Sequence, residues 1–290
     1  MKVLKLGTRA SKLAMTQSQW VADELQKHHR DLKIELVLIT TQGDKIIDKP
    51  LTEVGGKGLF LKEIEEALIK GEVDFAVHSL KDVPAQIPEE LVIASIPKRV
   101  DPRDVLISKS GEKLNHLKPG SKIGTSSLRR LEQLKKLRPD LQFIPMRGNV
   151  DTRLKKLKAG ETDGIILAAA GLIRLGLEKE VTEYLDIIPS VGQGALCLEA
   201  RKDDKDTLSI LQTLNDPLSY ECVQIERIFQ KTIGGGCEVP MGAYVREVDK
   251  EIFLIDAFLV HHEKFQIKSV EVSKKDADKK MAEIAKEFMS

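Results

Sequence analysis

Two segments of the chain, Gly124–Arg130 and Arg147–Arg153, combine arginines with hydroxyl or amide side chains. Each follows a short apolar run and precedes a helical pattern, so each is expected where a strand passes into a helix. Guanidinium groups bind planar anions through paired hydrogen bonds, and a helix N-terminus adds free N–H groups. Residues 121–158 hold eleven Lys or Arg against three Asp or Glu, whereas the whole chain carries +1. The sequence therefore predicts a site for a small ligand with several carboxylates or phosphates.

Composition narrows the class of protein. A length of 290 residues predicts two or three domains, and 41% hydrophobic with 31% charged residues is typical of an ordinary globular chain. Only 4% of residues are aromatic, which argues against stacking on single-stranded nucleic acid. The near-neutral charge argues against general binding to nucleic acid or membrane surfaces.

Signals for export and for metal binding are not found. Val3–Leu6 is predicted to be a strand and not the apolar core of a signal peptide, and the apolar stretch near residues 164–173 is too short to cross a bilayer. A cytoplasmic location is therefore expected. Three cysteines without a CxxC pair predict neither a zinc site nor a disulfide framework, so no metal is expected.

Strand and helix patterns alternate through the first two-thirds of the chain, as in an α/β domain with a largely parallel sheet. The pattern also recurs. Lys5–Thr8 resembles Lys122–Thr125, and Gly71–Val77 resembles Gly160–Ile166, in the same order. This favours two similarly built domains over the alternative that strand–Gly–Thr–helix is simply common.

Ligands of open α/β sheets bind at the carboxyl ends of the strands. Both strand–Gly–Thr turns are then expected to face a cleft between the domains. The residues expected to line it are Arg9 and Ser11 on one wall, with Ser127, Arg129 and Arg130 on the other.

The last third has a different pattern, with a helix near residues 218–231, three strand-like runs and a final helix near 276–288. This predicts a small α+β domain that presents Cys237 after three glycines. A lone cysteine is most often a small buried hydrophobe, which suits Cys197 and Cys222. It suits Cys237 poorly, because a triple-glycine loop is not core, so a covalent or nucleophilic role is the preferred interpretation.

The segment 78–84 follows a predicted buried strand. Asp82 is a candidate general acid or base and Lys81 a candidate anion contact; an ordinary surface ion pair explains them equally well. A hydrolase pairing of His78 with Ser79 is less favoured, because adjacent strand residues point to opposite faces.

Three further features are candidates for motion or binding. The glycine-rich segment 41–58 is not a Walker A motif and is interpreted as a lid, with a plain flexible loop as the alternative. Residues 191–195, which include Gln193, are a candidate hinge. Arg174 is a candidate anion contact, although a lone helical arginine is usually a surface residue.

Five collinear motifs together resemble the porphobilinogen deaminase family, also called hydroxymethylbilane synthases. They are Val77–Pro84, Gly124–Arg130, Arg147–Val150, Val191–Ala195 and Gly235–Pro240. Their order spans nearly the whole chain. Gln42 stands where the family often has arginine, which removes one expected anion contact.

The resemblance implies an α/β fold with two similar domains of the type II periplasmic-binding-protein kind around a cleft, plus a small α+β C-terminal domain. The implied divisions are 1–97 with 195–213, 98–194, and 217–290. It implies a transferase of tetrapyrrole (haem) biosynthesis. Such an enzyme deaminates and joins four porphobilinogen molecules head-to-tail on a covalent dipyrromethane primer, then releases hydroxymethylbilane by hydrolysis. A cytoplasmic monomer is implied, with porphobilinogen as its small-molecule partner and no nucleic acid, membrane or obligate protein partner.

The resemblance also implies roles for individual residues. Cys237 would carry the dipyrromethane cofactor through a thioether, and Asp82 would be the central acid/base. The residues expected to bind cofactor and substrate carboxylates are Arg9, Ser11, Lys81, Thr125, Ser126, Ser127, Arg129, Arg130, Arg147, Arg153, Arg174 and Gln193.

Three other functions are considered. A non-enzymatic binding protein for a polyanionic solute predicts an export signal and has no use for Cys237. An enzyme for a phosphate ligand predicts an acidic metal site or a P-loop. An inactive homologue is disfavoured because Asp82, Cys237 and the principal arginines are all present.

Overall fold

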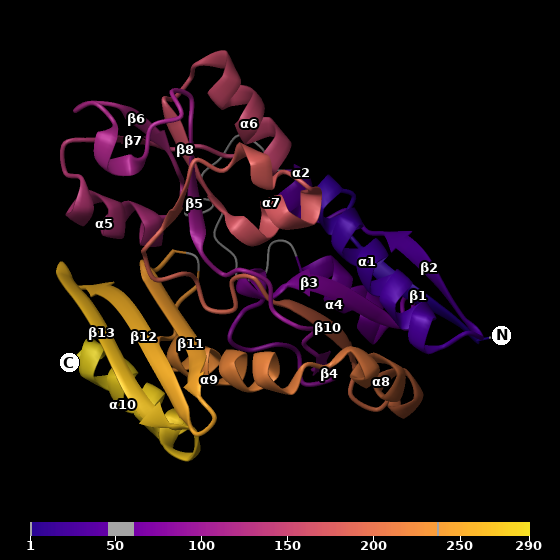
Figure 1. Cartoon of the computed structure of the whole chain (residues 1–290). Helices are drawn as coiled ribbons and strands as arrows, with labels where there is room; N and C mark the ends of the chain where they lie inside the picture. The colour runs from indigo at the N-terminus through magenta and orange to yellow at the C-terminus, as the bar shows by residue number, and fades with distance from the viewer. Residues whose placement is uncertain (1, 46–60, 237) are drawn as a thin grey trace. The chain divides into compact units, whose positions relative to one another are not determined.

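The computed structural model describes residues 2–45, 61–236 and 238–290 (Figure 1). The chain separates into two compact units, one formed by Met1–Val100 with Ala195–Glu221 and the other by Asp101–Gly194 with Cys222–Ser290. Most of the predicted lid and Cys237 fall outside the described residues.

The first unit contains a five-stranded sheet. β1 (Lys2–Thr8) lies between β2 (Leu32–Leu38) and β3 (Phe75–Ser79) and is parallel to both. β10 (Leu196–Arg201) lies between β3 and β4 (Leu91–Ser95) and is antiparallel to both. The sheet is therefore mixed: four strands share one direction, as the sequence pattern predicts, and the strand that returns late in the chain opposes them.

Helices cover both faces of this sheet. α1 (Lys12–His28) packs Val21 and Leu25 against Phe75 and its neighbours. Ala76, the next residue of β3, packs instead against α4 (Lys62–Ile69). Because successive strand residues point to opposite faces, α1 and α4 lie on opposite sides of the sheet. The remaining helical segments that begin in this unit are α2 (Gln42–Lys45), η1 (Leu80–Asp82), α8 (Lys205–Leu211), η4 (Gln212–Leu214) and α9 (Pro217–Ile233), which continues into the second unit.

The second unit contains a sheet with the same plan. β6 (Lys122–Gly124) lies between β7 (Gln142–Ile144) and β8 (Gly164–Ala168), parallel to both. β5 (Asp104–Ser108) lies between β8 and β9 (Glu183–Leu185), antiparallel to both. The helical segments around it are η2 (Leu114–His116), α5 (Leu128–Leu137), α6 (Val150–Ala159), α7 (Ala169–Leu175) and η3 (Glu178–Glu180).

The internal similarity predicted from the sequence is confirmed at the level of single residues. Leu6 pairs with Phe75 between β1 and β3, as Ile123 pairs with Gly164 between β6 and β8. The side chain of Asp74 accepts a hydrogen bond from the Lys5 N–H at 2.7 Å. In the second sheet, the Asp163 carboxylate accepts from the Lys122 N–H at 2.8 Å. The two sheets therefore share strand order, register and the capping of their central strand.

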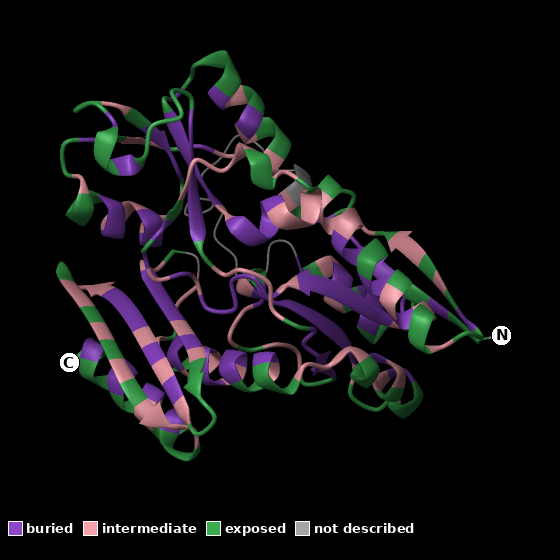
Figure 2. Cartoon of the chain, in the orientation of Figure 1, coloured by how far each residue is buried: buried purple, intermediate pink, exposed green. Residues whose placement is uncertain are grey.

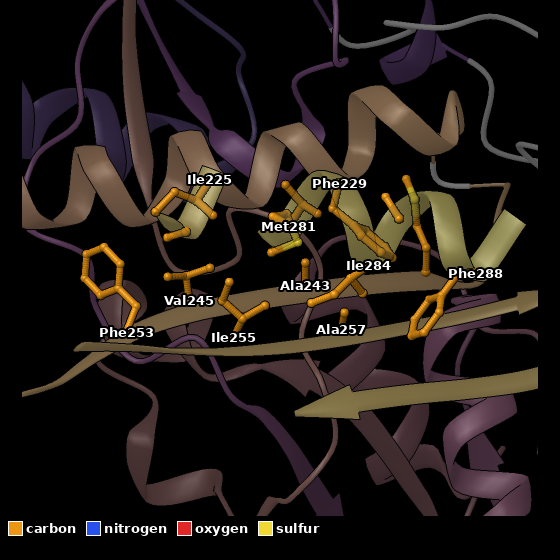
Figure 3. Packing of buried hydrophobic residues seen from close by; sticks show 14 of the residues in the cluster. Ile225, Phe229, Ala243, Val245, Phe253, Ile255, Ala257, Met281, Ile284 and Phe288 are labelled. Atoms are coloured by element: carbon orange, nitrogen blue, oxygen red, sulfur yellow. The ribbon is translucent and has the colours of Figure 1, made fainter. Parts of the chain in front are cut away.

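The C-terminal part of the second unit is a three-stranded antiparallel sheet with two helices on one face. The sheet is formed by β11 (Met241–Asp249), β12 (Ile252–His261) and β13 (Lys264–Ser273). η5 (Lys274–Asp276) leads into α10 (Ala277–Met289). Side chains of α9 and α10 interdigitate with alternate residues of β11 and β12 (Figure 3).

Burial follows this arrangement. Central strands of the sheets are buried, and the helices alternate buried and exposed positions (Figure 2). Cys197 and Cys222 are buried at 0% and 5% exposure, which confirms their interpretation as small core residues. Trp20 departs from the expected pattern: it is 44% exposed, although it falls within the apolar run of α1. None of the described helices is long and apolar enough to cross a membrane.

Candidate active site

The first arginine segment begins with a set of hydroxyl groups at the carboxyl end of β6. Ser127 is the N-cap of α5, and its Oγ accepts a hydrogen bond from the Arg130 N–H at 3.5 Å. The Thr125 hydroxyl accepts from the Ser127 N–H at 3.2 Å. The Ser126 hydroxyl donates to the Met146 carbonyl at 2.9 Å, which joins this turn to the segment that precedes α6. The two arginine segments are thus neighbours, as expected from adjacent parallel strands.

Arg129 and Arg130 are buried and share one carboxylate. Arg129 Nη1 lies 2.7 Å from Asp104 Oδ2, and Arg130 Nη2 lies 2.7 Å from Asp104 Oδ1. The Gln193 amide also donates to Asp104 Oδ1, at 3.0 Å. Further donations tie the arginines to the backbone: Arg129 to the Ile188 carbonyl and Arg130 to the Ile166 carbonyl. Two guanidinium groups and one carboxylate leave an excess positive charge in the interior.

The charges of this group shift one another's pKa. Burial by itself would raise the pKa of Asp104, but Arg129 and Arg130 outweigh it and hold that pKa well below its ordinary value. The pKa of Arg129 is lowered, first by burial and then by Arg130, with Asp104 opposing the shift. The carboxylate is therefore ionised at every physiological pH.

Arg153 adds positive charge without adding a carboxylate. It lies on α6, and its Nε donates to the Gly148 carbonyl at 2.8 Å. Burial and, to a smaller extent, the charges of Arg130 and Arg147 together lower its pKa to about 10. Arg130, Arg147 and Arg153 are therefore close enough to repel one another. We call Arg129, Arg130, Arg147 and Arg153 the arginine cluster.

Arg174 lies in the last turn of α7 and is not the surface residue that a lone helical arginine usually is. Its Nη2 donates to the Gly194 carbonyl at 2.7 Å, and burial lowers its pKa to about 10. This bond places it against the segment 191–195, next to Gln193.

Asp104 was missed by the sequence analysis. It begins the apolar strand β5 and is completely buried. An acidic residue at the start of a buried strand is costly unless it is paired. That rule, applied to the run Asp104–Ser108, is the signal that could have found it.

In the first unit, the candidate residues lie at one edge of the sheet. Ser11 is the N-cap of α1, where its Oγ accepts from the Ala14 N–H at 3.3 Å, and Arg9 stands between this cap and the end of β1. β3 ends at Ser79, and Lys81 and Asp82 follow in η1. Because β1 and β3 are parallel neighbours, both turns leave the same edge. Asp82 is exposed and Lys81 is half-buried.

A second polar group of this unit lies behind that edge. His78 Nε2 is 3.0 Å from Glu199 Oε2, and both side chains are almost completely buried. Glu65 on α4 interacts electrostatically with both of them. The sequence pattern indicates His78 only as a weak hydrolase candidate, and neither glutamate stands out in it.

The residues beside Cys237 form a tight turn. The Val239 N–H donates to the Gly236 carbonyl at 3.1 Å, and the Gly236 N–H donates to Glu238 Oε1 at 3.0 Å. Gly234 has a φ of +75°, which a residue with a Cβ rarely adopts. The three glycines thus make a sharp loop possible immediately before the cysteine. No group of three or more His, Cys, Asp or Glu that could hold a metal occurs in the described part of the chain.

The fold and the arginine cluster together define an α/β protein with a concentration of positive charge at the carboxyl ends of its strands. Comparison with protein-family models identifies the family. The cofactor-binding domain model of porphobilinogen deaminase, described as binding dipyrromethane, matches residues 4–209. The C-terminal domain model of porphobilinogen deaminase matches residues 220–290. The chain belongs to the porphobilinogen deaminase family.

Individual relatives agree with the family assignment. The porphobilinogen deaminase of Brevibacillus brevis is 53% identical over 243 residues, which cover 83% of this chain and 79% of the relative. That of Roseiflexus castenholzii is 50% identical over 254 residues, covering 87% and 84%. Among solved structures, the methionine-binding protein MetQ is similar with a TM-score of 0.46 at 15% identity, covering 76% of this chain and 90% of that one.

Proposed function

We propose that this chain joins porphobilinogen units into the linear tetrapyrrole hydroxymethylbilane on a dipyrromethane primer attached to Cys237. The observation that carries the proposal is the excess of guanidinium over carboxylate in the arginine cluster. Repulsion among Arg130, Arg147 and Arg153 costs free energy in the protein alone, and a ligand with several carboxylates removes that cost. Family membership supplies the identity of the ligand.

The arginine cluster suits a dipyrromethane group. Each pyrrole unit carries two carboxylates, and guanidinium groups bind carboxylates bidentately with fixed orientation. Arg129 and Arg130 are oriented from behind by Asp104, and we propose that Arg147, Arg153 and Arg174 contact the ligand carboxylates. The N-cap hydroxyl of Ser127 and the neighbouring Thr125 and Ser126 add neutral donors. When bound, the dipyrromethane supplies the nucleophilic pyrrole carbon on which the chain grows.

We assign the covalent attachment to the thiol of Cys237. Cys197 and Cys222 are core residues, so neither thiol is available to a ligand. The glycines at 234–236 support this assignment, because residues without a Cβ allow a ligand to approach the backbone beside them closely. A thioether forms when the sulfur replaces the amino group of a porphobilinogen side chain, with ammonia as the leaving group.

Asp82 is the residue to which we assign proton transfer. It is exposed at the end of β3, where a ligand can reach its carboxylate. A carboxyl group there can give a proton to a departing amine, and its anion can then stabilise the positive charge that remains. Arg9, Ser11 and Lys81 lie at the same sheet edge, and we assign them to the carboxylates of the incoming substrate.

Motion, location and assembly are further parts of the proposal. Four successive additions require the protein to accommodate a growing chain, and the segment 191–195 is our candidate hinge. Its Gly192 N–H donates to Glu226 Oε2 on α9 at 2.7 Å, so a movement of residues 191–195 would break this hydrogen bond or displace α9. We keep the division into residues 1–97 with 195–213, 98–194 and 217–290 as the functional one. We also propose a cytoplasmic monomer, which fractionation and light scattering of the purified protein can test.

The decisive experiment is the intact mass of the purified protein beside a Cys237→Ser variant. An excess equal to two condensed pyrrole units, absent from the variant, supports the covalent primer. If the protein carries no excess, porphobilinogen is added and the mass measured again. A mass that still does not change overturns the proposal, and binding of an unmodified polyanionic solute becomes the better explanation. Cys222→Ser, which alters a core thiol, is the control expected to keep the added mass.

A further inference from the structure

A buried group of acidic side chains lies directly behind the segment that carries Asp82. Glu199 on β10 is only 1% exposed and contacts His78 on β3, with 3.0 Å between His78 Nε2 and Glu199 Oε2. Glu199 and His78 come from neighbouring antiparallel strands, in which His78 pairs with Cys197. Glu65 comes from α4, which packs on this face of the sheet. Three separate elements thus place three titratable groups together.

These side chains contain oxygens that lack a hydrogen-bond partner. Glu199 Oε1 and Glu65 Oε1 are both buried, and neither has a partner in the structure. An ionised carboxylate oxygen in this position loses its water without gaining a donor, which costs free energy. A proton bound to one of the carboxyl groups removes a charge from the pair and supplies a donor.

Among the described residues, no Lys or Arg side chain forms an ion pair with Glu65 or Glu199. On α4, the Glu63 side chain accepts from the Gln42 N–H and adds another acid. On β10, Arg201 is engaged by Asp74 and Asp204 at the far end of the strand. His78 on β3 is the one group found to favour ionisation of Glu65, and its Nε2 already contacts Glu199.

The electrostatic balance agrees with the geometry. Burial and, to a smaller extent, the negative charge of Glu199 raise the pKa of Glu65, His78 opposes the shift, and the net result is a pKa of about 7.

We propose that Glu65, Glu199 and His78 hold one shared proton at neutral pH and act as positioning residues for the Asp82 turn. Loss of that proton leaves the buried carboxylate of Glu199 and the half-buried carboxylate of Glu65 to repel each other across the contact between α4 and β10. Because β10 is paired with β3, this repulsion also acts on β3.

The connection from this cluster to Asp82 is short and made of ordered backbone. His78 is followed by Ser79, whose Oγ accepts from the Gln17 amide at 3.0 Å. The Leu80 N–H donates to the Ala195 carbonyl at 3.1 Å, and the Val83 N–H closes η1 on Leu80. A shift at the end of β3 therefore changes where Asp82 is held. The positioning role rests on the proposed function, whereas proton sharing does not.

The first test needs no substrate. Carboxyl-carbon NMR of the whole protein labelled at glutamate is expected to show a group that titrates near pH 7 and is lost in Glu65→Gln. Glu66→Gln, which changes an exposed neighbour on α4, is the control expected to retain it. If all glutamates titrate near their ordinary values, proton sharing is overturned even if the enzyme is fully active.

Thermal unfolding gives an independent readout of the same proton. An acid with a raised pKa in the folded state loses stability as pH rises from its ordinary value, near 4.5, to the raised value. Glu65→Gln should therefore increase Tm by about 2 to 4 °C at pH 8 and change it little at pH 4.5. An equal change of Tm at both pH values contradicts the proposal.

The positioning role is tested by the pH profile of kcat. As the cluster loses its proton between pH 6 and 8.5, wild-type kcat is expected to fall by about tenfold more than that of Glu65→Gln. Glu66→Gln should follow the wild type. If the NMR titration is found but the two profiles coincide, the cluster is structural only and the positioning role is overturned. If no variant forms hydroxymethylbilane, the proposed function itself has failed.

Discussion

The two α/β sheets share strand order and register, but their buried polar groups carry opposite charge. In the first sheet, the interior holds Glu65 and Glu199 with one histidine, and carboxylate oxygens lack partners. In the second, Arg129 and Arg130 share the single carboxylate of Asp104. Both central carboxylates stand on the antiparallel strand, β10 in one sheet and β5 in the other.

This difference shows that one scaffold can hold polar interiors of opposite charge, which is what the two proposed roles require. An excess of carboxylate retains protons near neutral pH, which suits the half that carries Asp82. An excess of guanidinium attracts anions, which suits a half that holds pyrrole carboxylates. Backbone capping by Asp74 and Asp163 is the same in both, so the same strand arrangement accommodates interiors of either charge.

The largest effect is expected for Asp82→Ala. Turnover should fall by about 10² to 10⁴-fold because proton transfer to the departing amine is lost. Since Asp82 is exposed, Tm should stay near the wild-type value. Steady-state formation of hydroxymethylbilane measures the first quantity, and circular dichroism on heating measures the second. Glu89→Ala, a change of a nearby exposed acid, is the control, and near-normal activity of Asp82→Ala would remove Asp82 from the mechanism.

Asp104→Asn should strongly weaken the second unit. The change leaves Arg129 and Arg130 buried without a counter-charge, and loss of one partner of a buried pair costs about 3 to 5 kcal/mol. Denaturant titration measures this loss. Asp101→Asn breaks the more exposed pair of Asp101 with Arg103 and should cost at most about 1 kcal/mol.

The effect of Asp104→Asn should also depend on pH. The pKa of Asp104 is held below its ordinary value, so the stability that it contributes is present above pH 4 and is lost as pH falls further. The difference between variant and wild type should therefore narrow below pH 4. A constant difference over this range would mean that the hydrogen bonds of Asp104, and not its charge, provide the stability.

Arg153→Gln is expected to act in opposite directions on stability and binding. Its guanidinium is repelled by Arg130 and Arg147, so the change should stabilise the primer-free protein by about 0.5 to 1 kcal/mol. The same change should slow chain elongation. Denaturant titration in a Cys237→Ser background gives the first value, and single-turnover kinetics of the Arg153→Gln enzyme with Cys237 retained gives the second. Lys155→Gln, an exposed change on α6, is the control; a destabilised Arg153→Gln protein would contradict the repulsion argument.

Effects on stability of similarly small size, without a loss of turnover as their main consequence, are expected at the two helix caps. Ser11→Ala and Ser127→Ala each remove one hydrogen bond at an N-terminus and should each cost about 1 kcal/mol of stability. Fluorescence of Trp20, the single tryptophan, follows α1 directly. Clearly unequal losses of stability in Ser11→Ala and Ser127→Ala would show that the two caps, although they share a backbone geometry, contribute differently to stability.

The sequence predicts the fold well because its strongest signals are local. Alternation, glycine stops and the repeated Gly-Thr turns indicate β1, β3, β6 and β8 and their equivalence, which register pairing confirms. The direction of β10 is not local information, because it depends on which strands flank residues 196–201. The roles of the site residues stay predictions.

The polar interior is the part that the sequence shows least clearly. Arg129 and Arg130 are visible as a dense charged pair, but their partner Asp104 lies 25 residues before Arg129 in an apolar strand. Glu65 and Glu199 resemble ordinary surface acids until the packing of α4 on β10 buries them. Motif spacing indicates candidate ligand-binding residues such as Arg129 and Arg130. The residues that orient these side chains, such as Asp104, become visible only from tertiary contacts.

The place of β10 in the first sheet has a consequence for synthesis on the ribosome. β10 separates β3 from β4, yet it is made about a hundred residues after β4. Until then β4 has no neighbouring strand, whereas all five strands of the second sheet lie within residues 104–185. The second sheet can therefore close before the first, reversing the N-terminal-first order usual for multidomain chains. A nascent chain halted at residue 194 would expose the unpaired edges of β3 and β4 to chaperones or to other chains.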